Sequence, residues 1–437
     1  MAVRFVTKLA EPLRVPESVI TIPMTLNRQD LSGIVNHLLG KTGTSSAESH
    51  LSEFATNGIL TDENMNAFDF LINDKFLRSS LSRFMDTNGI LKENTLDIEY
   101  IVALTVPDEE GQSVDVKEWI SDIAVSVDKK QVVLGCCDGT LRVYSSSNWK
   151  LLRQSASMGQ SVKNVQYGDD STIYAAYMDG MVRHFDADGQ VAAEYGGSNS
   201  ALSCLQIDLE KQHIAAGNTT GQVLIWGSNN DGIDAGEGND SEEEEGEKRK
   251  KRHRLNQELT PVLLSHGLCV VNAICWVLDG QQLVSCGSDG MVCLWDPATL
   301  TKICSLSAPA PFTALQRRTS QALVAATTEG QCLLLSIAKA SSTDISPMTI
   351  KASPMKRLQG GAWMTDLALP VTTSATQRIA TISRDGKIRI WDDRCDRPLN
   401  VISAHEGVGL CCSFLDESTL LSGGQDGILH VTPLRSL

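Results

Sequence analysis

Histidine, serine and aspartate, the side chains of many nucleophilic active sites, occur together in one stretch of this 437-residue chain. The stretch contains His266, Ser285, Asp289 and Trp295. In a hydrolase, the first three could supply a base, a nucleophile and an orienting carboxylate. Here, however, the aspartate precedes a glycine, the tryptophan follows six residues later, and this pattern recurs along the chain. The recurrence predicts a structural tetrad, a buried polar chain that is stabilising only when every member is hydrogen-bonded.

Seven Asp-Gly pairs or near equivalents mark the repeat. They are Asp138-Gly139, Asp179-Gly180, Thr220-Gly221, Asp289-Gly290, Glu329-Gly330, Asp385-Gly386 and Asp426-Gly427. Successive pairs lie 41, 41, 69, 40, 56 and 41 residues apart, and an aromatic residue usually follows after six positions. A period of about 40 to 45 residues with a strand-ending Trp-Asp is typical of a WD-repeat β-propeller. We therefore expect residues 105–437 to form an all-β seven-bladed WD40 propeller whose ring closure protects the strand edges.

The full tetrad is predicted in one repeat only. Blade seven keeps His405, Ser422 and Asp426 but has Thr432 in place of tryptophan. The other blades are more divergent, and we expect packing between neighbouring blades to hold them. The chain ends soon after the third strand of blade seven, so we expect Glu99–Pro107 to supply the fourth strand.

The two long spacings locate insertions, at about 228–257 and at Ala340–Met355. The first has nine acidic residues over Asp231–Glu247 and then a basic run. Runs of like charge stay solvated, so this insertion is expected to be disordered. The basic residues are Lys248, Arg249, Lys250, Lys251, Arg252 and Arg254. We predict a nuclear import signal; contact with RNA phosphates and a self-neutralising loop are the alternatives.

Composition narrows the class of protein. A net charge of −15 disfavours a broad nucleic-acid binder. No apolar run approaches the 18 or so residues of a membrane helix. The twelve cysteines form no Cys-x-x-Cys pair, which predicts buried thiols in a reducing compartment rather than structural zinc. A Gly-rich phosphate loop and a metal-spaced His cluster are also missing from the sequence, so we expect no enzyme, no small-molecule substrate and no cofactor of its own.

Residues 1–104 follow a different pattern, which predicts a small α+β ubiquitin-like (β-grasp) domain. Along Thr95–Ala103, apolar and acidic residues alternate as in a half-buried strand. A polar segment at about 41–67 is expected to be a long flexible insertion. The expected elements are strands Val3–Leu9 and Ser18–Met24, helix Asn27–Leu39, and strands Phe68–Ile72, Phe76–Leu81 and Thr95–Ala103.

Three N-terminal stretches, Leu31–Gly40, Phe68–Leu81 and Leu96–Tyr100, resemble the Notchless-type N-terminal domain. Glu118–Ser121 (EWIS) and the acidic-then-basic insertion narrow the resemblance to the WD-repeat subunit of the PeBoW complex. That family implies a non-catalytic factor for maturation of the large (60S) ribosomal subunit and its rRNA. The implied partners are the block-of-proliferation WD-repeat protein, Pescadillo and pre-60S particles, in the nucleus, nucleolus and nucleoplasm, with no membrane.

The resemblance also implies that midasin, a AAA ATPase, grasps the ubiquitin-like domain and removes the subunit from the particle. In that grasp an acidic residue completes the coordination of Mg²⁺ held by midasin. Glu93 is the residue expected to do so here, with Asp86 and Glu99 in reserve. Mg²⁺ takes oxygen ligands in near-octahedral geometry, and a carboxylate suits an open position.

One rival function rests on Trp391-Asp392-Asp393-Arg394, which matches the WDxR motif of cullin ubiquitin ligase substrate receptors. The motif is weakly specific because Trp-Asp ends many WD strands. Arginines near strand ends are candidate partner contacts of the propeller, because arginine is favoured in interfaces; a solvated role is the alternative. Examples are Arg384, Arg389, Arg394 and Arg397.

Overall fold

The computed structural model divides the chain into two units, Met1–Pro107 with Leu434–Leu437, and Asp108–Pro433. It describes the chain except for residues 8, 10, 12, 41–66, 74, 92–94, 106–110, 169–170, 209–212, 228–260, 340–347, 355–361, 371–377, 393–397 and 437. Within the described residues, no helix is long and apolar enough to cross a membrane.

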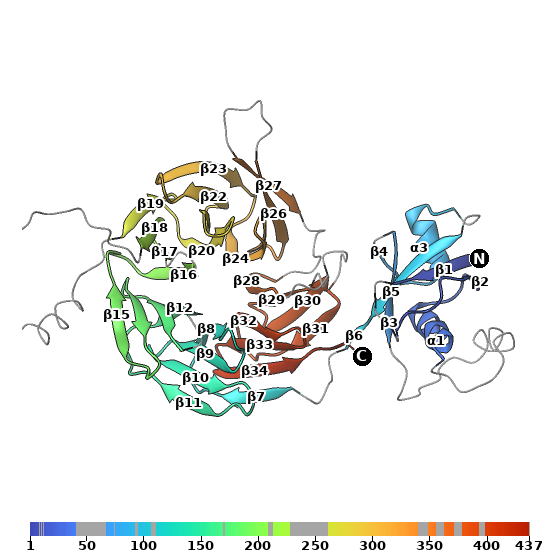
Figure 1. Ribbon diagram of the computed structural model, residues 1–437, viewed down its shortest axis with the longest axis horizontal. Helices are drawn as coiled ribbons and strands as arrows, with labels where there is room; N and C mark the ends of the chain where they lie inside the picture. The colour runs from blue at the N-terminus through green and yellow to red at the C-terminus, as the bar shows by residue number, and fades with distance from the viewer. Residues whose placement is uncertain are drawn as a thin grey trace, which may run out of the picture. The chain divides into compact units, whose positions relative to one another are not determined.

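The first unit has a mixed five-stranded sheet in the order β2-β1-β5-β3-β4, which is the β-grasp arrangement (Figure 1). Strand β1 lies between β2 and β5; it runs parallel to β5 and antiparallel to β2. Helix α1 begins after Asn27, whose side chain accepts from two backbone N–H groups in a capping box with Asp30. The elements are β1 (Ala2–Val6), β2 (Val19–Thr21), α1 (Arg28–Leu38), β3 (Phe68–Ile72), β4 (Lys75–Phe76), α3 (Leu81–Asn88) and β5 (Leu96–Val102).

The expected strand Phe76–Leu81 is wrong, because the chain turns into helix α3 after two residues of β4. Leu81, Phe84 and Met85 bury one face of this helix, at the spacing of a single helical stripe. The helix ends at Gly89, whose φ of 64° is readily adopted by glycine. The sequence prediction ended its strand at Leu81 and assigned no element to residues 82–88, so it missed this helix.

The second unit is a ring of seven four-stranded antiparallel sheets in the described chain, so the seven-bladed fold is confirmed (Figure 1). First strands lie at the centre of the ring and fourth strands at its rim. Blades one to three comprise β8 (Ile120–Val125), β9 (Gln131–Cys136), β10 (Leu141–Ser145), β11 (Leu151–Gln154); β12 (Val162–Tyr167), β13 (Ile173–Tyr177), β14 (Val182–Phe185), β15 (Val191–Tyr195); and β16 (Leu202–Asp208), β17 (His213–Asn218), β18 (Gln222–Gly227), β19 (Val262–Ser265). Blades four to six comprise β20 (Val271–Val277), β21 (Gln282–Gly287), β22 (Met291–Asp296), β23 (Thr301–Ser307); β24 (Phe312–Thr319), β25 (Ala322–Thr327), β26 (Cys332–Lys339), β27 (Met348–Pro354); and β28 (Met364–Ala368), β29 (Arg378–Ser383), β30 (Lys387–Asp392), β31 (Asn400–Ser403).

Blade seven is completed by a segment that precedes blade one. It comprises β32 (Gly409–Asp416), β33 (Thr419–Gly424), β34 (Ile428–Pro433) and β7 (Gln112–Asp115). The expectation that Glu99–Pro107 supplies this fourth strand is wrong. Most of that segment belongs to β5 or to β6 (Leu104–Thr105), and β6 pairs with β35 (Arg435–Ser436) in the first unit.

The two predicted insertions fall between the third and fourth strands of blades three and five. Residues 228–257 lie outside the described residues. Of the second segment, Met348–Pro354 forms β27 and pairs with β26, so that part is strand rather than the expected loop.

Each first strand of the propeller contains a bulge near its start, and side chains there connect neighbouring blades. The Asp122 carboxylate accepts from the Asn164 amide and the Val165 N–H of the next blade, each at 2.7 Å. The corresponding Asp366 carboxylate accepts from the Cys412 N–H at 3.0 Å. These contacts satisfy backbone donors that a simple sheet ladder would leave without partners.

Burial, followed by the nearby Asp366 carboxylate, raises the pKa of Asp122 to about 8. Burial also raises the pKa of Asp366, to about 6. A folded-state pKa above the unfolded value means that the folded protein binds the proton more tightly. The stabilisation by the Asp122 proton is therefore complete below the unfolded pKa and is lost as pH rises towards about 8.

We predict that the propeller loses stability between pH 6 and 8 and that Asp122→Asn removes part of this loss. Both aspartates keep partial contact with solvent. We therefore expect the free energy of unfolding to fall by only roughly 1–2 kcal/mol over this pH range. Urea unfolding followed by tryptophan fluorescence measures it, because all seven tryptophans lie in the propeller unit.

Asp128→Asn is the matched control. Hydrogen bonds, first from the Lys130 backbone, lower the pKa of Asp128 to about 2, so its carboxyl does not titrate in this range. An Asp122→Asn protein with the same pH dependence as wild type would contradict the assignment.

Candidate functional site

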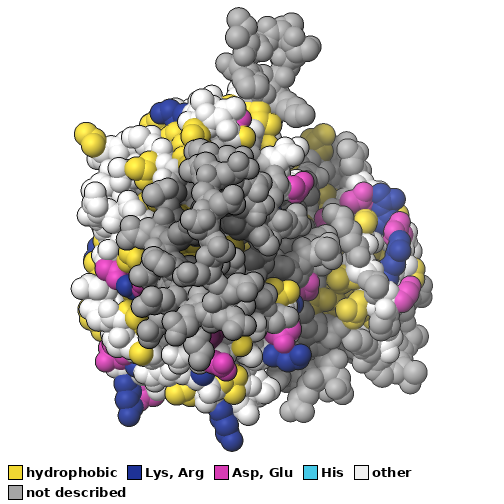
Figure 2. Space-filling view, turned by 60° about the vertical axis from the view of Figure 1, so that its left-hand side comes forward, with side chains coloured by type: hydrophobic (Ala, Val, Ile, Leu, Met, Phe, Trp, Pro, Cys, Tyr) yellow, Lys and Arg dark blue, Asp and Glu magenta, His cyan; other side chains and the backbone are white. Residues whose placement is uncertain are grey.

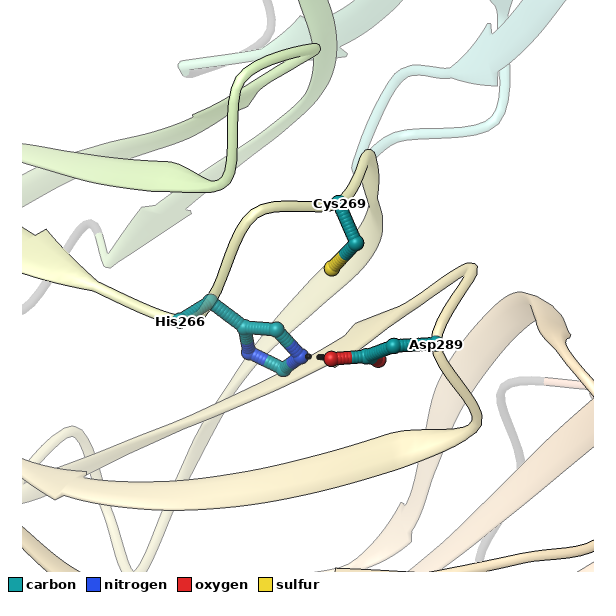
Figure 3. A group of neighbouring side chains, drawn as sticks. All are labelled: His266, Cys269 and Asp289. Atoms are coloured by element: carbon teal, nitrogen blue, oxygen red, sulfur yellow. Dashed lines mark ion pairs between the residues drawn. The ribbon is translucent and has the colours of Figure 1, made fainter.

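The four tetrad residues of blade four lie together, and hydrogen bonds join Trp295, Ser285 and His266 in sequence. Trp295 Nε1–H donates to Ser285 Oγ at 2.7 Å, and Ser285 Oγ also lies 2.7 Å from His266 Nδ1. His266 Nε2 faces Asp289 Oδ1 at 3.5 Å (Figure 3). Asp289 in turn accepts from the Met291 N–H at the Asp-Gly turn. The chain links the loop before β20 to the second and third strands of the blade.

This geometry gives Ser285 no access to a substrate. Ser285 is fully buried, and its Oγ already contacts the side chains of His266 and Trp295. Burial lowers the pKa of His266, although the nearby Asp289 carboxylate opposes the shift. The set therefore pins the blade rather than exposing a nucleophile.

Blade seven has a related chain without the tryptophan. His405 Nδ1 contacts the Asp426 carboxylate at 2.9 Å, and Nε2 lies 2.9 Å from Ser422 Oγ. Thr432, at the tryptophan position, is buried. The ring of His430 packs edge-on against that of His405.

In three other blades an arginine replaces histidine as the partner of the turn aspartate. Each arginine follows its aspartate by four residues. The pairs are Asp138–Arg142 at 2.8 Å, Asp179–Arg183 at 2.7 Å and Asp385–Arg389 at 2.5 Å. The sequence prediction missed these pairs, although the signal Asp-Gly-x-x-Arg is visible in the chain. Blades one, two and six are therefore held by an ion pair at the turn as well as by packing.

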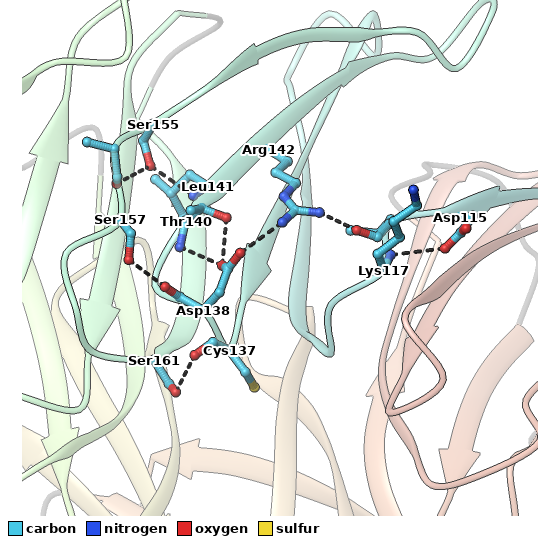
Figure 4. Close-up of polar contacts among 12 residues, drawn as sticks. Asp115, Lys117, Cys137, Asp138, Thr140, Leu141, Arg142, Ser155, Ser157 and Ser161 are labelled. Atoms are coloured by element: carbon cyan, nitrogen blue, oxygen red, sulfur yellow. Dashed lines mark hydrogen bonds and ion pairs between the residues drawn. The ribbon is translucent and has the colours of Figure 1, made fainter.

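The pair in blade one also fastens the ring closure (Figure 4). Arg142 donates to Asp138 and to the carbonyl of Val116, the residue that follows β7. Asp138 accepts in addition from the Thr140 N–H and hydroxyl. One guanidinium thus connects blade one to the end of the strand that completes blade seven.

Two exposed tryptophans occupy equivalent places before the first strands of blades one and six. The Trp119 carbonyl accepts from the Cys137 N–H, and the Trp363 carbonyl accepts from the Arg384 N–H in the same pattern. The side chains are 49% and 46% exposed. The Arg384 guanidinium lies 4.5 Å from the centroid of the Trp363 ring. Exposed aromatic and arginine side chains are enriched in protein interfaces.

The other arginines predicted as contacts differ from Arg384. Arg389 is buried and paired with Asp385, so its expected role as a surface contact is wrong. Arg394 and Arg397 lie outside the described residues. Of the WDxR motif, Trp391 and Asp392 are buried. Trp391 donates to Thr381 Oγ1 at 2.9 Å, a contact within its own blade.

The predicted metal-contact residue Glu93 lies outside the described residues, as does the basic run 248–254. The residues on either side of 92–94 are Leu91 and Thr95, and both are exposed. Leu91 follows the end of α3, and Thr95 precedes β5, whose Leu96 and Ile98 are buried in the core. Of the reserve candidates, Asp86 is exposed on α3 and Glu99 is half-buried on β5.

Figure 2 shows the side of the propeller that carries blades two and three. On its described surface, basic and acidic side chains are interspersed, and hydrophobic ones are scattered among polar groups.

Residues 1–85 match the family described as the NLE (NUC135) domain, and residues 257–296 match the WD domain, G-beta repeat. The chain is 26% identical to a protein named "Ribosome biogenesis protein WDR12 homolog" of Arabidopsis thaliana, over 98% of this chain and 96% of that protein. The protein of the same name from Oryza sativa subsp. japonica is 25% identical over 98% and 95%. "Ribosome biogenesis protein ytm1" of Neosartorya fischeri is 26% identical over 90% and 81%. These matches confirm the resemblance inferred from the sequence and support a role in ribosome biogenesis.

We predict that Ser285→Ala destabilises the propeller by about 1–3 kcal/mol, because it leaves Trp295 Nε1–H and His266 Nδ1 buried without their shared partner. Urea unfolding followed by tryptophan fluorescence gives the change in free energy. Ser305→Ala, on the exposed face of β23 in the same blade, is the control and is expected to have little effect. Equal stability of the two variants would show that the tetrad does not pin the blade.

Proposed function

We propose that this NLE-domain WD-repeat protein is a non-catalytic assembly factor for the large (60S) ribosomal subunit and takes part in rRNA maturation. The observation that carries the proposal is similarity over nearly the whole chain to proteins named for ribosome biogenesis. The structure is compatible with a scaffold, because the serine, histidine and aspartate side chains of the tetrad are used within the blade. We place the protein in the nucleus, with the run 248–254 as its import signal.

The propeller is the part proposed to dock the block-of-proliferation WD-repeat protein, which with Pescadillo would hold the complex on pre-60S particles. The surface that supports this role is the pair of exposed tryptophans, Trp119 and Trp363, with Arg384 stacked on the second ring. Large rigid aromatic side chains lose little conformational entropy on binding and often dominate interface energies.

The β-grasp unit is proposed as the handle by which the AAA ATPase midasin removes the protein from the particle. Glu93 would complete the coordination of Mg²⁺ held by midasin. Its neighbours in the chain connect a helix anchored by Leu81, Phe84 and Met85 to a strand that is paired on both sides. Such anchoring limits the ordering cost of presenting a carboxylate.

We predict that Glu93→Ala abolishes midasin binding while the domain stays folded, and that Glu93→Asp, one methylene shorter, weakens binding strongly. The measurement is a pull-down of midasin's adhesion domain by the full chain in Mg²⁺ buffer. A parallel sample with chelator should also lose binding, because the metal bridges the two proteins.

Asp86→Ala is the control, since it removes an exposed carboxylate from α3 of the same unit. Full-strength binding by Glu93→Ala, or loss of binding with Asp86→Ala alone, would overturn the assignment to Glu93.

We also predict that Trp119→Ser combined with Trp363→Ser lowers recovery of the block-of-proliferation protein at least tenfold, a loss of about 1.4 kcal/mol or more. Both side chains are about half exposed, so the propeller should keep its fold. Co-purification with the tagged full chain measures the effect.

Val127→Ser provides the control for loss of an exposed apolar side chain. Val127 is 71% exposed in the turn between β8 and β9, at the other end of the strand from Trp119. If the double tryptophan variant recovers as much partner as this control, docking uses another surface.

A further inference from the structure

A cysteine stands beside the tetrad of blade four and brings a third metal-binding atom to it. His266, Cys269 and Asp289 each direct one potential ligand atom into the same space, and these atoms all lie within 4.8 Å of one another (Figure 3). His266 and Cys269 come from the loop before β20, whereas Asp289 comes from the turn between β21 and β22. Nitrogen, sulfur and oxygen from these three residue types are the donors that Zn²⁺ prefers in proteins.

A glycine keeps the space between the three atoms open. A Cβ at Gly287 would lie 2.9 Å from His266 Nε2, 2.9 Å from Cys269 Sγ and 2.9 Å from Asp289 Oδ1. Any side chain at position 287 would therefore crowd all three donors at once. Zinc–ligand bonds are about 2.0–2.3 Å long, so the donors need only modest inward movement to reach a shared ion.

The imidazole nitrogen that faces this space has no hydrogen-bond partner at ordinary length. His266 Nε2 is buried, and its nearest carboxylate oxygen is 3.5 Å away. The other ring nitrogen, Nδ1, lies 2.7 Å from Ser285 Oγ. If Nδ1–H donates to this oxygen, the Nε2 lone pair points at the open space. A hydrogen bond of this kind to the second nitrogen is the usual support of a metal-binding histidine.

The space is reachable from solvent on the side of the carboxylate. The Asp289 side chain is 30% exposed and Cys269 is half-buried, whereas the His266 side chain is fully buried. An ion held by three protein ligands could thus keep a fourth position for water. Metal binding at Cys269 would displace the thiol proton, because the thiolate is the form that coordinates a metal.

We propose that His266 Nε2, Cys269 Sγ and the Asp289 carboxylate form a zinc-binding site in blade four. Binding exchanges the thiol proton for the ion: Zn²⁺ joins the sulfur, nitrogen and carboxylate oxygen, and one H⁺ passes to solvent. The site fixes the loop before β20 to the β21–β22 turn. The proposal departs from the sequence expectation that the chain holds no metal of its own, because His-x-x-Cys with a distant aspartate lies outside the Cys-x-x-Cys pattern.

Blade seven shows what the same tetrad looks like without the third donor. Its loop from His405 to Gly409 is one residue shorter than the loop from His266 to Val271 and holds no cysteine. Both ring nitrogens of His405 lie 2.9 Å from a partner, Asp426 or Ser422. His430 stands near this group, but a metal there would have to displace one of these contacts.

The test is metal binding by the full chain, with zinc content measured after purification and Co²⁺ used as the spectroscopic probe. Wild type is expected to retain about one zinc per chain. Replacement by Co²⁺ should give a thiolate-to-cobalt charge-transfer band. Cys269→Val should lose the band and reduce zinc affinity by at least about tenfold.

Gly287→Ala tests the geometry without removing a ligand, because its methyl group would occupy the space between the donors. It is also expected to lose the band. Gly424→Ala is its matched control, since the added Cβ would meet His405 Nδ1 at 2.8 Å in the corresponding place of blade seven. Cys304→Val, a half-buried thiol in β23, controls for loss of a cysteine. Both controls should bind like wild type.

Wild-type protein with no zinc and no thiolate band would overturn the proposal. So would a Cys269→Val protein that binds as wild type does. Loss of the metal in Gly424→Ala but not in Gly287→Ala would place the ion in blade seven and would equally contradict a site in blade four. Tryptophan fluorescence of each variant shows whether the propeller has remained folded.

Discussion

The backbone pairing of β7 with β34 is the interaction on which the rest of the propeller depends. Without it, blade seven would have three strands and β34 would present an unpaired edge to solvent, which invites association with other chains. Four residue pairs make the contact, from Ile428 with Asp115 to Val431 with Gln112. Val116 continues it by donating to the Gly427 carbonyl, and Arg142 then fastens the Val116 carbonyl to blade one. The ring is therefore closed by chain segments more than 300 residues apart in sequence.

A second constraint concerns the aspartate of each Asp-Gly turn. A carboxylate that is partly buried at a turn needs a cation or several N–H donors nearby. Blades four and seven supply a histidine from the preceding loop, and blades one, two and six supply an arginine from the following strand. In blades three and five the residue before the turn glycine is Thr220 and Glu329, respectively. These turns lack the aspartate and are stabilised in another way. In blade three, Asn218 Oδ1 accepts from the Thr220 and Gln222 N–H groups. The same turn is thus stabilised in three ways: by a histidine, by an arginine, or by an asparagine that accepts from the turn N–H groups.

The blade count could be predicted from sequence because the turns demand it. Each anchor glycine adopts positive φ, such as 83° at Gly139, which few other residues adopt without strain. The closing strand could not be found in the same way, because Gln112–Asp115 is short and mostly polar. The alternation at Leu96, Ile98 and Tyr100, which suggested a strand nearby, serves the core of the β-grasp unit instead. The tetrad was visible in sequence, but the space beside it was not. That space exists because Gly287, at the end of β21, lies close to Cys269 in the loop before β20. The spacing of residues in the sequence does not show which loops lie next to each other. The position of Glu93 stays a prediction.

The central claim is that this ring and its β-grasp unit serve as a scaffold on a maturing ribosomal particle. The most direct measurement is sedimentation of the tagged full chain from nuclear extract, with RNA sizing and mass spectrometry of the fractions. We expect the protein to sediment with precursor RNA of the large subunit, together with Pescadillo and the block-of-proliferation protein. Sedimentation as free protein with a cullin and its adaptor, and without ribosomal precursor RNA, would contradict the account.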